Sequence, residues 1–419
     1  MGFLKLAYNE CDGCGMEEVK AVHGYIRLNG DGSLTALDSA GQAAEAGSGL
    51  AAELVAAVLA GAAGGLSCTA GTLETVRTPL PAAGSGSAET AVPVDMTNLS
   101  VVVGGDKIVK LVRHWGGADR SARLLARLAE ARVAVVPGYF GSLDWIHPTR
   151  GRGTIALVSA MVPDGSDGWS WAVDDVVAWF RGGTAPRWPA TLGTLVAGVH
   201  CALLGAGQHS PPDASEVRDR TARVLEDALA VTGGAAGTRL ANRAGHLAEL
   251  LQSVPETAGP AFDLHGDLHL GQILRAGGTY WLLDFDGDPQ LPAAERDRPD
   301  TAARDVAHLA ASLDLVASVA AKRLQVSDQA SLARLYGWAE EASVLMTGAY
   351  RDASSVAGKP GLLDESLLPP LIAEQLLREL IYAHRFLPRW QYAADGALTF
   401  RISRDHTRTK EPSWTPPAL

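Results

Sequence analysis

The stretch at residues 265–272 reads His-Gly-Asp-Leu-His-Leu-Gly-Gln, and residues 284–288 read Asp-Phe-Asp-Gly-Asp. An apolar run at residues 280–283, Tyr-Trp-Leu-Leu, leads directly into the second stretch and indicates a short strand. Phosphoryl transfer from ATP needs a carboxylate that holds the acceptor hydroxyl, and side-chain oxygens that hold Mg²⁺ on the nucleotide phosphates. Both stretches carry such groups, so together they predict a phosphotransferase site.

Individual roles follow from the spacing of these side chains. Asp267 is the predicted catalytic residue, either as the base for the acceptor hydroxyl or as the residue that orients it. Gln272 and Asp284 are the predicted Mg²⁺ ligands, because hard cations prefer amide and carboxylate oxygens. Two acidic loops can also arise by chance in an acidic chain. The spacing of five residues, the paired histidines and the apolar run favour the catalytic interpretation.

Protein kinases carry the related patterns H-R-D-x-x-x-x-N and D-F-G. In this chain Gly266 stands in place of the arginine and Gln272 in place of the asparagine. These replacements point toward kinases that act on small molecules. His265 and His269 are interpreted as structural residues that fix the loop through hydrogen bonds. Asp305 is interpreted as an acid that stabilises the first turn of a helix.

The composition is that of an ordinary globular chain of 419 residues, 47% hydrophobic and 20% charged. Its formal net charge of −11 argues against nucleic acid or an anionic membrane as a partner. Four cysteines are too few for a disulfide scaffold, and Cys11 and Cys14 have no second pair with which to bind zinc. The first residues lack the pattern of a signal peptide, so we expect a cytoplasmic enzyme with small-molecule partners.

The chain is expected to have an N-terminal cap subdomain at 1–90, a small β-containing lobe at 91–162 and a large α-helical lobe at 163–419. The fold class is therefore α+β with two lobes. The strand candidates are residues 24–28, 73–76, 100–103, 107–112 and 154–158. The helix candidates are residues 50–66, 190–204, 215–231, 304–316, 331–350 and 368–386.

The small lobe should supply a lysine for the α- and β-phosphates of ATP. Lys107 and Lys110 both lie on the second strand of a predicted hairpin, whose turn is Gly-Gly-Asp at 104–106. Their spacing places them on opposite faces of the strand. We favour Lys110, because an ammonium among apolar neighbours needs an anionic partner, whereas Lys107 beside the turn is expected in solvent. The predicted contacts for the adenine edge are backbone groups of Ser159, Ala160 and Met161.

The segment at residues 374–392 combines an apolar stripe with a polar stripe at helical spacing. The apolar side chains at 376, 377, 380 and 381 would be buried, and the polar side chains would lie on the opposite face. A mixed polar face with an aromatic platform suits the hydroxyl groups of a sugar; the alternative is a solvated face with Glu–Arg pairs. The predicted substrate-binding residues are Asp300, Gln375, Arg378, Glu379, Tyr382 and Trp390.

These motifs resemble those of bacterial maltokinases and of a related group of glucosamine kinases. The stretches at 265–272 and 284–288 look nearly the same as in maltokinases, as does Arg-Asp-Val-Ala at 304–307. The segment at 374–390 departs from maltokinases at positions expected to face the sugar. Its Gln-x-x-Arg-Glu-x-x-Tyr pattern resembles that of glucosamine kinases.

The resemblance implies a kinase-like fold with a cap, a small lobe and a helical lobe, and it implies ATP and Mg²⁺ as cofactors. It also implies an ATP-dependent sugar kinase that converts D-glucosamine to D-glucosamine 6-phosphate. Two alternatives stay open: a maltokinase, which converts maltose to maltose 1-phosphate, and an aminoglycoside phosphotransferase.

Overall fold

The computed structural model describes residues 16–81, 86–92, 99–116, 119–256 and 259–405. The chain divides into two compact units. The first is the chain up to Ala126 together with Gly138–Val162, and the second is Arg127–Pro137 together with the chain from Pro163 onward. The predicted lack of a zinc site at Cys11 and Cys14 concerns residues outside the described ranges.

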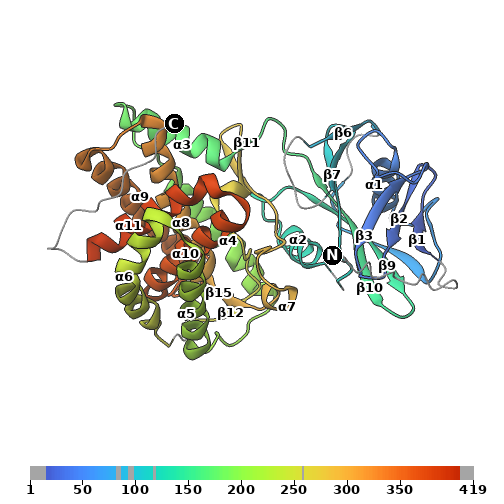
Figure 1. Cartoon of the computed structure of the whole chain (residues 1–419). Helices are drawn as coiled ribbons and strands as arrows, with labels where there is room; N and C mark the ends of the chain where they lie inside the picture. Colours follow the sequence, from blue (N-terminus) through green and yellow to red (C-terminus); the bar gives the residue numbers. More distant parts are fainter. Residues whose placement is uncertain (1–15, 82–85, 93–98, 117–118, 257–258, 406–419) are drawn as a thin grey trace, which may run out of the picture. The chain divides into compact units, whose positions relative to one another are not determined.

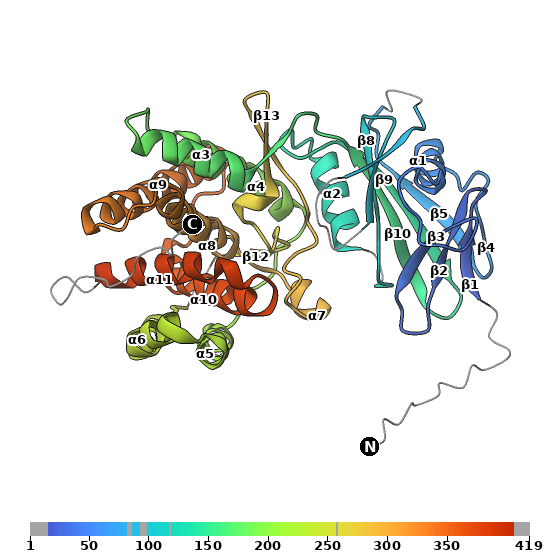
Figure 2. The ribbon, with the colours of Figure 1, turned by 45° about the horizontal axis from the view of Figure 1, so that its top comes forward.

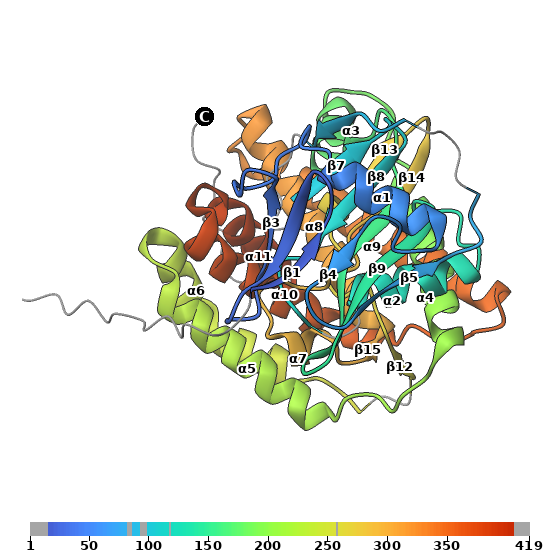
Figure 3. The same cartoon turned by 90° about the vertical axis from the view of Figure 1, so that its right-hand side faces the viewer.

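Two antiparallel sheets build the first unit. The strands of the smaller sheet are β1 (Glu17–Lys20), β2 (Gly24–Leu28), β3 (Leu34–Asp38) and β4 (Ser67–Cys68). The strands of the larger sheet are β5 (Thr72–Arg77), β6 (Glu89–Ala91), β7 (Leu99–Val103), β8 (Lys107–Leu111), β9 (Tyr139–His147) and β10 (Gly151–Ala160). Their orders are β3-β2-β1-β4 and β5-β9-β10-β8-β7-β6. The helix α1 (Leu50–Ala60) lies across one face of the larger sheet, where Leu54 and Val58 are fully buried (Figure 3).

The hairpin of β7 and β8 forms as predicted from the sequence. Its turn has glycine at 104 and 105 with φ values of +66° and +77°, in the left-handed region that glycine adopts without a steric penalty. Along β8 the side chains alternate, with Lys107, Val109 and Leu111 buried and those between them half-buried. This period of two is expected for a strand that turns one face to a core.

The prediction that Lys107 lies in solvent is wrong. Its side chain is 2% exposed, and its ammonium nitrogen lies 2.7 Å from Asp106 Oδ1. Lys110 is half-buried on the other face of the strand. The alternation along β8 turns position 107 into the core, and Asp106 supplies the counter-charge that makes this burial tolerable. Burial therefore does not single out Lys110 as the phosphate-binding lysine.

The segment expected as a cap contributes strands to the larger sheet. β5 pairs with β9, and β6 pairs with β7. Residue 90 lies inside β6, so strands from 1–90 and from 91–162 belong to one sheet. The short segment Arg127–Pro137, by contrast, belongs to the second unit, and α2 (Arg120–Glu130) crosses the division.

The second unit is mainly helical. Its long helices are α3 (Gly168–Phe180), α4 (Trp188–Ala206), α5 (Ala214–Val231), α6 (Gly234–Gln252), α8 (Ala302–Leu324), α9 (Gln329–Val356), α10 (Leu368–Phe386) and α11 (Gln391–Asp405). Its short elements are β11 (Ser166–Asp167), β12 (Ala261–Phe262), η1 (Leu270–Gln272), β13 (Ile273–Ala276), β14 (Thr279–Leu282), α7 (Ala293–Arg296), β15 (Asp300–Thr301), η2 (Glu365–Leu367) and η3 (Pro388–Trp390). α5 and α6 lie side by side against α10 (Figures 1 and 2).

α8 is the central helix of this unit. Every residue from Asp305 to Ser318 is buried, because α3, α9, α10 and α11 all pack on it. Its many alanines let those helices approach closely. A helix that is covered on all sides is a rigid support, and α8 carries two of the side chains that build the site described below.

α4 is long and apolar enough to cross a membrane by length and composition. In this unit it packs closely on α9. A Cβ added at Gly193 would lie 2.0 Å from the carbonyl oxygen of Met346, so the two helix backbones are nearly in contact. This packing accounts for the apolar character of α4 as that of a core helix.

The secondary structure predicted from periodicity is largely confirmed. The strands β2, β7 and β8 and the helix α10 occur where they were expected, and the chain contains both sheets and helices, as the α+β class requires. The apolar stripe of α10 is buried, with exposures of 0% at Leu376 and Leu377 and 2% at Leu380.

Candidate active site

The loop at residues 263–269, here called the catalytic loop, follows β12 and is held by one carboxylate. The backbone N–H of His265 donates to Asp305 Oδ2 at 2.8 Å, and that of Gly266 donates to Asp305 Oδ1 at 2.9 Å. Gly266 has φ +84°, a conformation that favours glycine. The two bonds fix the backbone immediately before Asp267.

Asp305 is in turn held by two side chains from other helices. His200 Nε2 on α4 donates to Asp305 Oδ2 at 3.1 Å, and His200 Nδ1 lies 2.8 Å from the hydroxyl of Tyr350 on α9. Burial opposes ionisation of Asp305, but the hydrogen bond and charge of His200 and the N–H of Gly266 hold its pKa well below the ordinary value. The predicted structural role of Asp305 is therefore confirmed, and it extends from the helix terminus to the catalytic loop.

Gln272 and Asp284 lie beside the paired strands β13 and β14. The N–H of Leu283 donates to the carbonyl oxygen of Gln272 at 2.9 Å, so the residue before Asp284 is bonded to Gln272. His265 Nε2 lies 2.8 Å from the carbonyl oxygen of Leu283, which ties the catalytic loop to the same place. Asp284 has φ +56°, in the left-handed region that aspartate tolerates better than most residues. The structure thus gathers the residues predicted for phosphoryl transfer.

The site is strongly acidic. Burial raises the pKa of Asp267 well above its ordinary value, and the carboxylates of Asp288, Asp284, Glu379 and Asp305 raise it further. Such a group of charges needs a cation. An amide oxygen and a carboxylate beside one hairpin fit Mg²⁺, which usually takes one or two protein carboxylates, substrate phosphates and water. Within the described ranges no three His, Cys, Asp or Glu side chains are placed to hold a metal ion by themselves.

Two imidazoles flank the carboxylate of Asp267. His269 Nε2 lies 3.8 Å from Oδ2, and His308 Nδ1, which comes from α8, lies 3.8 Å from Oδ1. Burial is the main cause that lowers the pKa of His269 to about 4 and that of His308 well below its ordinary value. Both rings are therefore neutral near pH 7. His269 Nδ1 accepts a hydrogen bond from the N–H of Gly271 at 3.0 Å, which confirms its predicted role in fixing the loop.

α10 contributes a polar pair to the same group of side chains. Gln375 Nε2 lies 2.9 Å from His308 Nε2 and 3.3 Å from Glu379 Oε1. Burial raises the pKa of Glu379 to about 7, against hydrogen bonds from Gln375 and Trp390 that favour the ionised form. Within the part of the chain that the structure describes, no lysine, arginine or histidine forms an ion pair with Glu379. No described residue therefore supplies its carboxylate with a counter-charge.

An aromatic pair lies beside this acid. Trp390 packs edge-to-face on Trp169 with ring centroids 5.3 Å apart, and Trp169 stacks on His269 at 6.2 Å. Trp169 lies in the first turn of α3, directly after Gly168. A Cβ added at Gly168 would lie 1.8 Å from the carbonyl oxygen of Leu270, so α3 can begin here only with glycine.

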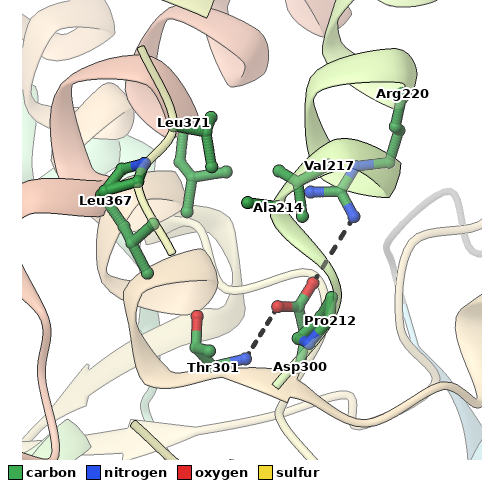
Figure 4. A pocket seen from close by; sticks show the side chains of 10 residues that line it. Pro212, Ala214, Val217, Arg220, Asp300, Thr301, Leu367 and Leu371 are labelled. Atoms are coloured by element: carbon green, nitrogen blue, oxygen red, sulfur yellow. Dashed lines mark hydrogen bonds and ion pairs between the residues drawn. The ribbon is translucent and has the colours of Figure 1, made fainter. Parts of the chain in front are cut away.

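Asp300 and Arg378 belong to a buried ion-pair network. The carboxylate of Glu374 lies 2.8 Å from Arg378, 3.2 Å from Arg220 and 3.7 Å from Arg304. Asp300 lies 3.6 Å from Arg220 and 3.7 Å from Arg304. Figure 4 shows Arg220 and Asp300 turned toward one another at a small pocket with apolar side chains around it. Arg378 is only 9% exposed, and the charge of Glu374 offsets the cost of burying it.

Comparison with known proteins identifies the family. No family model matches the chain. The glucosamine kinase of Streptacidiphilus jiangxiensis is 38% identical over 323 residues, which cover 74% of this chain and 73% of the relative. The glucosamine kinase of Mycolicibacterium smegmatis is 36% identical over 318 residues, which cover 74% and 78%. The chain belongs to the glucosamine kinase family.

Solved structures of glucosamine kinases agree with this assignment. A glucosamine kinase in complex with glucosamine, ADP and inorganic phosphate matches with a TM-score of 0.78 at 32% identity, over 92% of this chain and 93% of that chain. A second crystal form of a glucosamine kinase matches with a TM-score of 0.76. The kinase-like α+β fold expected from the motifs is therefore confirmed.

In this glucosamine kinase family member, two of the predicted adenine contacts have backbone N–H groups that are already used. The N–H of Ala160 donates to the carbonyl oxygen of Gly138 at 2.7 Å, and that of Met161 donates to the carbonyl oxygen of Asp106 at 2.9 Å. Ala160 and Met161 could therefore contact an adenine edge only through their carbonyl groups. Ser159 lies within β10, opposite Ile108 of β8.

Sequence reasoning missed four side chains of the site. His200, Trp169 and Tyr350 carry no motif, and only the packing of α3, α4 and α9 brings them to the catalytic loop. His308 follows Asp305 by three residues, which places it on the same face of α8. That spacing was the one available signal for it.

Proposed function

We propose that this glucosamine kinase family member transfers the terminal phosphoryl group of ATP to the 6-hydroxyl of D-glucosamine. The observation that carries the proposal is the carboxylate of Glu379, which has no ion-pair partner among the described residues and lies in a hydrogen-bonded chain with Gln375 and His308 beside Asp267. The amine of glucosamine is largely protonated near neutral pH. A charge-assisted contact with Glu379 is about twice as strong as a neutral hydrogen bond, so it would select the amino sugar.

Glu379 is a better candidate for this contact than Asp300. The carboxylate of Asp300 is already close to Arg220 and Arg304, and it accepts a hydrogen bond from the N–H of Thr301 at 2.7 Å. An acid with two arginine partners has little attraction left for an amine. Gln375, Arg378, Tyr382 and Trp390 remain the proposed contacts for the hydroxyl groups and the ring.

Asp267 is the proposed catalytic residue. Its carboxylate would accept the proton of the 6-hydroxyl as the oxygen attacks the phosphorus, and the bond from phosphorus to the ADP oxygen breaks. A raised pKa suits a group that must take up a proton, because basicity increases with pKa. The hydrogen bonds of the catalytic loop to Asp305 keep this carboxylate in place.

The nucleotide sites are part of the same proposal. Gln272 and Asp284 would hold Mg²⁺, which, when bound, neutralises charge on the phosphate oxygens. Lys110, which lies half-buried on β8, remains the proposed phosphate-binding lysine. The net charge of −11 supports small-molecule partners, without nucleic acid or membrane, and a cytoplasmic location is proposed with them.

The two alternatives fit the site less well. Maltose carries no charge, so it cannot form an ion pair with the buried carboxylate of Glu379. A polycationic aminoglycoside would need several such acids, but Glu374 and Asp300 are compensated by arginines. Of Glu374, Asp300 and Glu379, only Glu379 lacks an arginine partner among the described residues, and one such acid matches one amine.

The test is ADP release by the purified full chain with ATP and Mg²⁺ and, in parallel, glucosamine, glucose, maltose or an aminoglycoside. We expect the highest kcat/KM with glucosamine and a 6-phosphate product by NMR. Glu379→Gln should lower kcat/KM for glucosamine far more than for glucose, because only the amine loses a counter-charge. Strong turnover of maltose with none of glucosamine would overturn the proposal.

A further inference from the structure

The geometry points to a hydrogen-bond relay from Glu379 through Gln375 and His308 to Asp267. In this relay His308 is a positioning residue that presents its Nδ1–H to the catalytic carboxylate. The relay deepens the proposed function and rests on it for the identity of the acceptor. The arrangement of the four side chains stands on contacts within the second unit alone.

The first step is the orientation of the Gln375 amide. Its Nε2 lies 3.3 Å from Glu379 Oε1 and 2.9 Å from His308 Nε2. Above its pKa of about 7 Glu379 is ionised and only accepts hydrogen bonds, so the NH₂ group of Gln375, and not its amide oxygen, faces Glu379. The NH₂ group has two hydrogens, which allows it to donate to Glu379 and to His308 together.

The second step is the tautomer of His308. A neutral imidazole has one nitrogen that donates and one that accepts. Because the amide of Gln375 donates to Nε2, the hydrogen of His308 must lie on Nδ1. That nitrogen is 3.8 Å from Asp267 Oδ1. This distance exceeds a hydrogen bond, as is common for catalytic contacts before the substrate is bound, and it shortens to one when the Michaelis complex forms.

The other oxygen of Asp267 provides a comparison. His269 Nε2 faces Oδ2 at 3.8 Å, and His269 Nδ1 accepts from the N–H of Gly271 at 3.0 Å. The hydrogen of His269 therefore lies on Nε2, which faces Asp267 at 3.8 Å and the side-chain amide of Gln272 at 3.5 Å. The two rings are held by different elements. His269 is held by Gly271 of its own loop, whereas His308 is held by Gln375 of α10, the helix proposed to bind the acceptor.

The consequence is a coupling between acceptor recognition and catalysis. When an amine binds Glu379, it fixes the orientation of the Gln375 amide and, through it, the Nδ1–H of His308. The catalytic carboxylate of Asp267 is therefore oriented when the acceptor is in place. His308 touches no reacting atom in this scheme. It acts through Asp267, and its loss should lower kcat more than it changes KM.

The direct test is the tautomer of His308 in the full chain without ligands. In protein with ¹⁵N-labelled histidine, long-range proton–nitrogen correlation distinguishes Nδ1–H from Nε2–H. We expect His308 as Nδ1–H and His269, the internal control, as Nε2–H. Gln375→Leu should abolish the single tautomer of His308 and leave that of His269 unchanged. His308 as Nε2–H in the unmodified protein would overturn the relay.

A pair of substitutions tests its effect on turnover. The amide nitrogen of asparagine can occupy the place of Nδ1, and that of glutamine the place of Nε2. We expect His308→Asn to retain most of kcat, and His308→Gln to lower kcat by up to roughly 10²-fold, the cost of a 1 Å misplacement at a reacting centre. Equal kcat values in two folded variants would contradict the relay. If either variant fails to fold, the tautomer measurement decides.

The two proposals fail in different ways. An unmodified protein that does not phosphorylate glucosamine removes the proposed function, whereas the tautomer of His308 can still be measured. If the protein phosphorylates glucosamine but His308 carries its hydrogen on Nε2, the proposed function stands and the relay is wrong.

Discussion

His200 Nε2 donates a hydrogen bond to Asp305 Oδ2 at 3.1 Å, although the two residues lie on different helices and both side chains are almost fully buried. The same carboxylate accepts the N–H groups of His265 and Gly266. The helical core is thereby connected to the loop that carries Asp267. The position of Asp267 therefore depends on how α4, which carries His200, packs against α8, which carries Asp305.

Asp305→Asn should lower kcat by about 10-fold or more, as expected when a partner that orients a reacting group is lost. It should also lower the free energy of unfolding by about 1–3 kcal/mol, because an amide NH₂ would face backbone donors. Urea unfolding and turnover per folded molecule measure the two effects. Asp314→Asn is the matched control, since Asp314 is a buried acid of the same helix, bonded to Arg401. Equal kcat values in the two variants would contradict the role of Asp305.

Asp267→Asn should lower kcat by roughly 10²-fold or more, the size expected for a general base. Nucleotide binding should persist, because the substitution leaves Gln272 and Asp284 in place. Turnover and ADP binding by calorimetry measure the two properties separately. Near-normal turnover in a folded variant would remove Asp267 from the reaction.

Asp284→Asn should abolish turnover at saturating Mg²⁺ while it leaves the melting temperature close to that of the unmodified protein. Asparagine tolerates the left-handed backbone at this position, with φ +56°, but it is a weaker ligand than a carboxylate. Asp284→Ala adds backbone strain and should lose stability as well. Removal of Mg²⁺ by a chelator should stop turnover of the unmodified protein, and added Mg²⁺ should restore it.

The pH dependence of kcat/KM for glucosamine should report Glu379. The pKa of this acid is raised to about 7, so it is neutral below that pH and ionised above it. We therefore expect kcat/KM to rise as pH increases through about 7, and to fall again where the amine of glucosamine loses its proton. Glu379→Gln should remove the rising limb. If kcat/KM of Glu379→Gln still rises with pH through this range, another group causes the rise.

Gly168→Ala should disrupt the site without any loss of charge. Its Cβ would meet the carbonyl oxygen of Leu270 at 1.8 Å, so either α3 or η1 must move. We expect lower kcat and a lower melting temperature. Gly198→Ala on α4 is the control, because nothing lies within 4 Å of its added Cβ. Alanine there should raise the free energy of unfolding by about 0.5–1 kcal/mol through its helix propensity.

Local sequence determined the parts of this protein that depend on near neighbours. The spacing of Asp267 and Gln272, and the apolar run before Asp284, identified a phosphoryl-transfer site because the loop and the hairpin are continuous in the chain. The periodicity of α10 predicted its bounds and its buried stripe for the same reason. Residue identity and spacing are sufficient where one element carries the whole pattern.

Tertiary structure alone decided which polar groups are buried and paired. Lys107 is in the core and Arg378 is in an ion-pair network, because counter-charges from Asp106 and Glu374 offset the cost of desolvation. His200 and His308 join the site because α8 brings together elements that are distant in sequence. A one-dimensional pattern contains neither the partner nor the distance, and both are needed to set the charge, the tautomer and the orientation of a buried group.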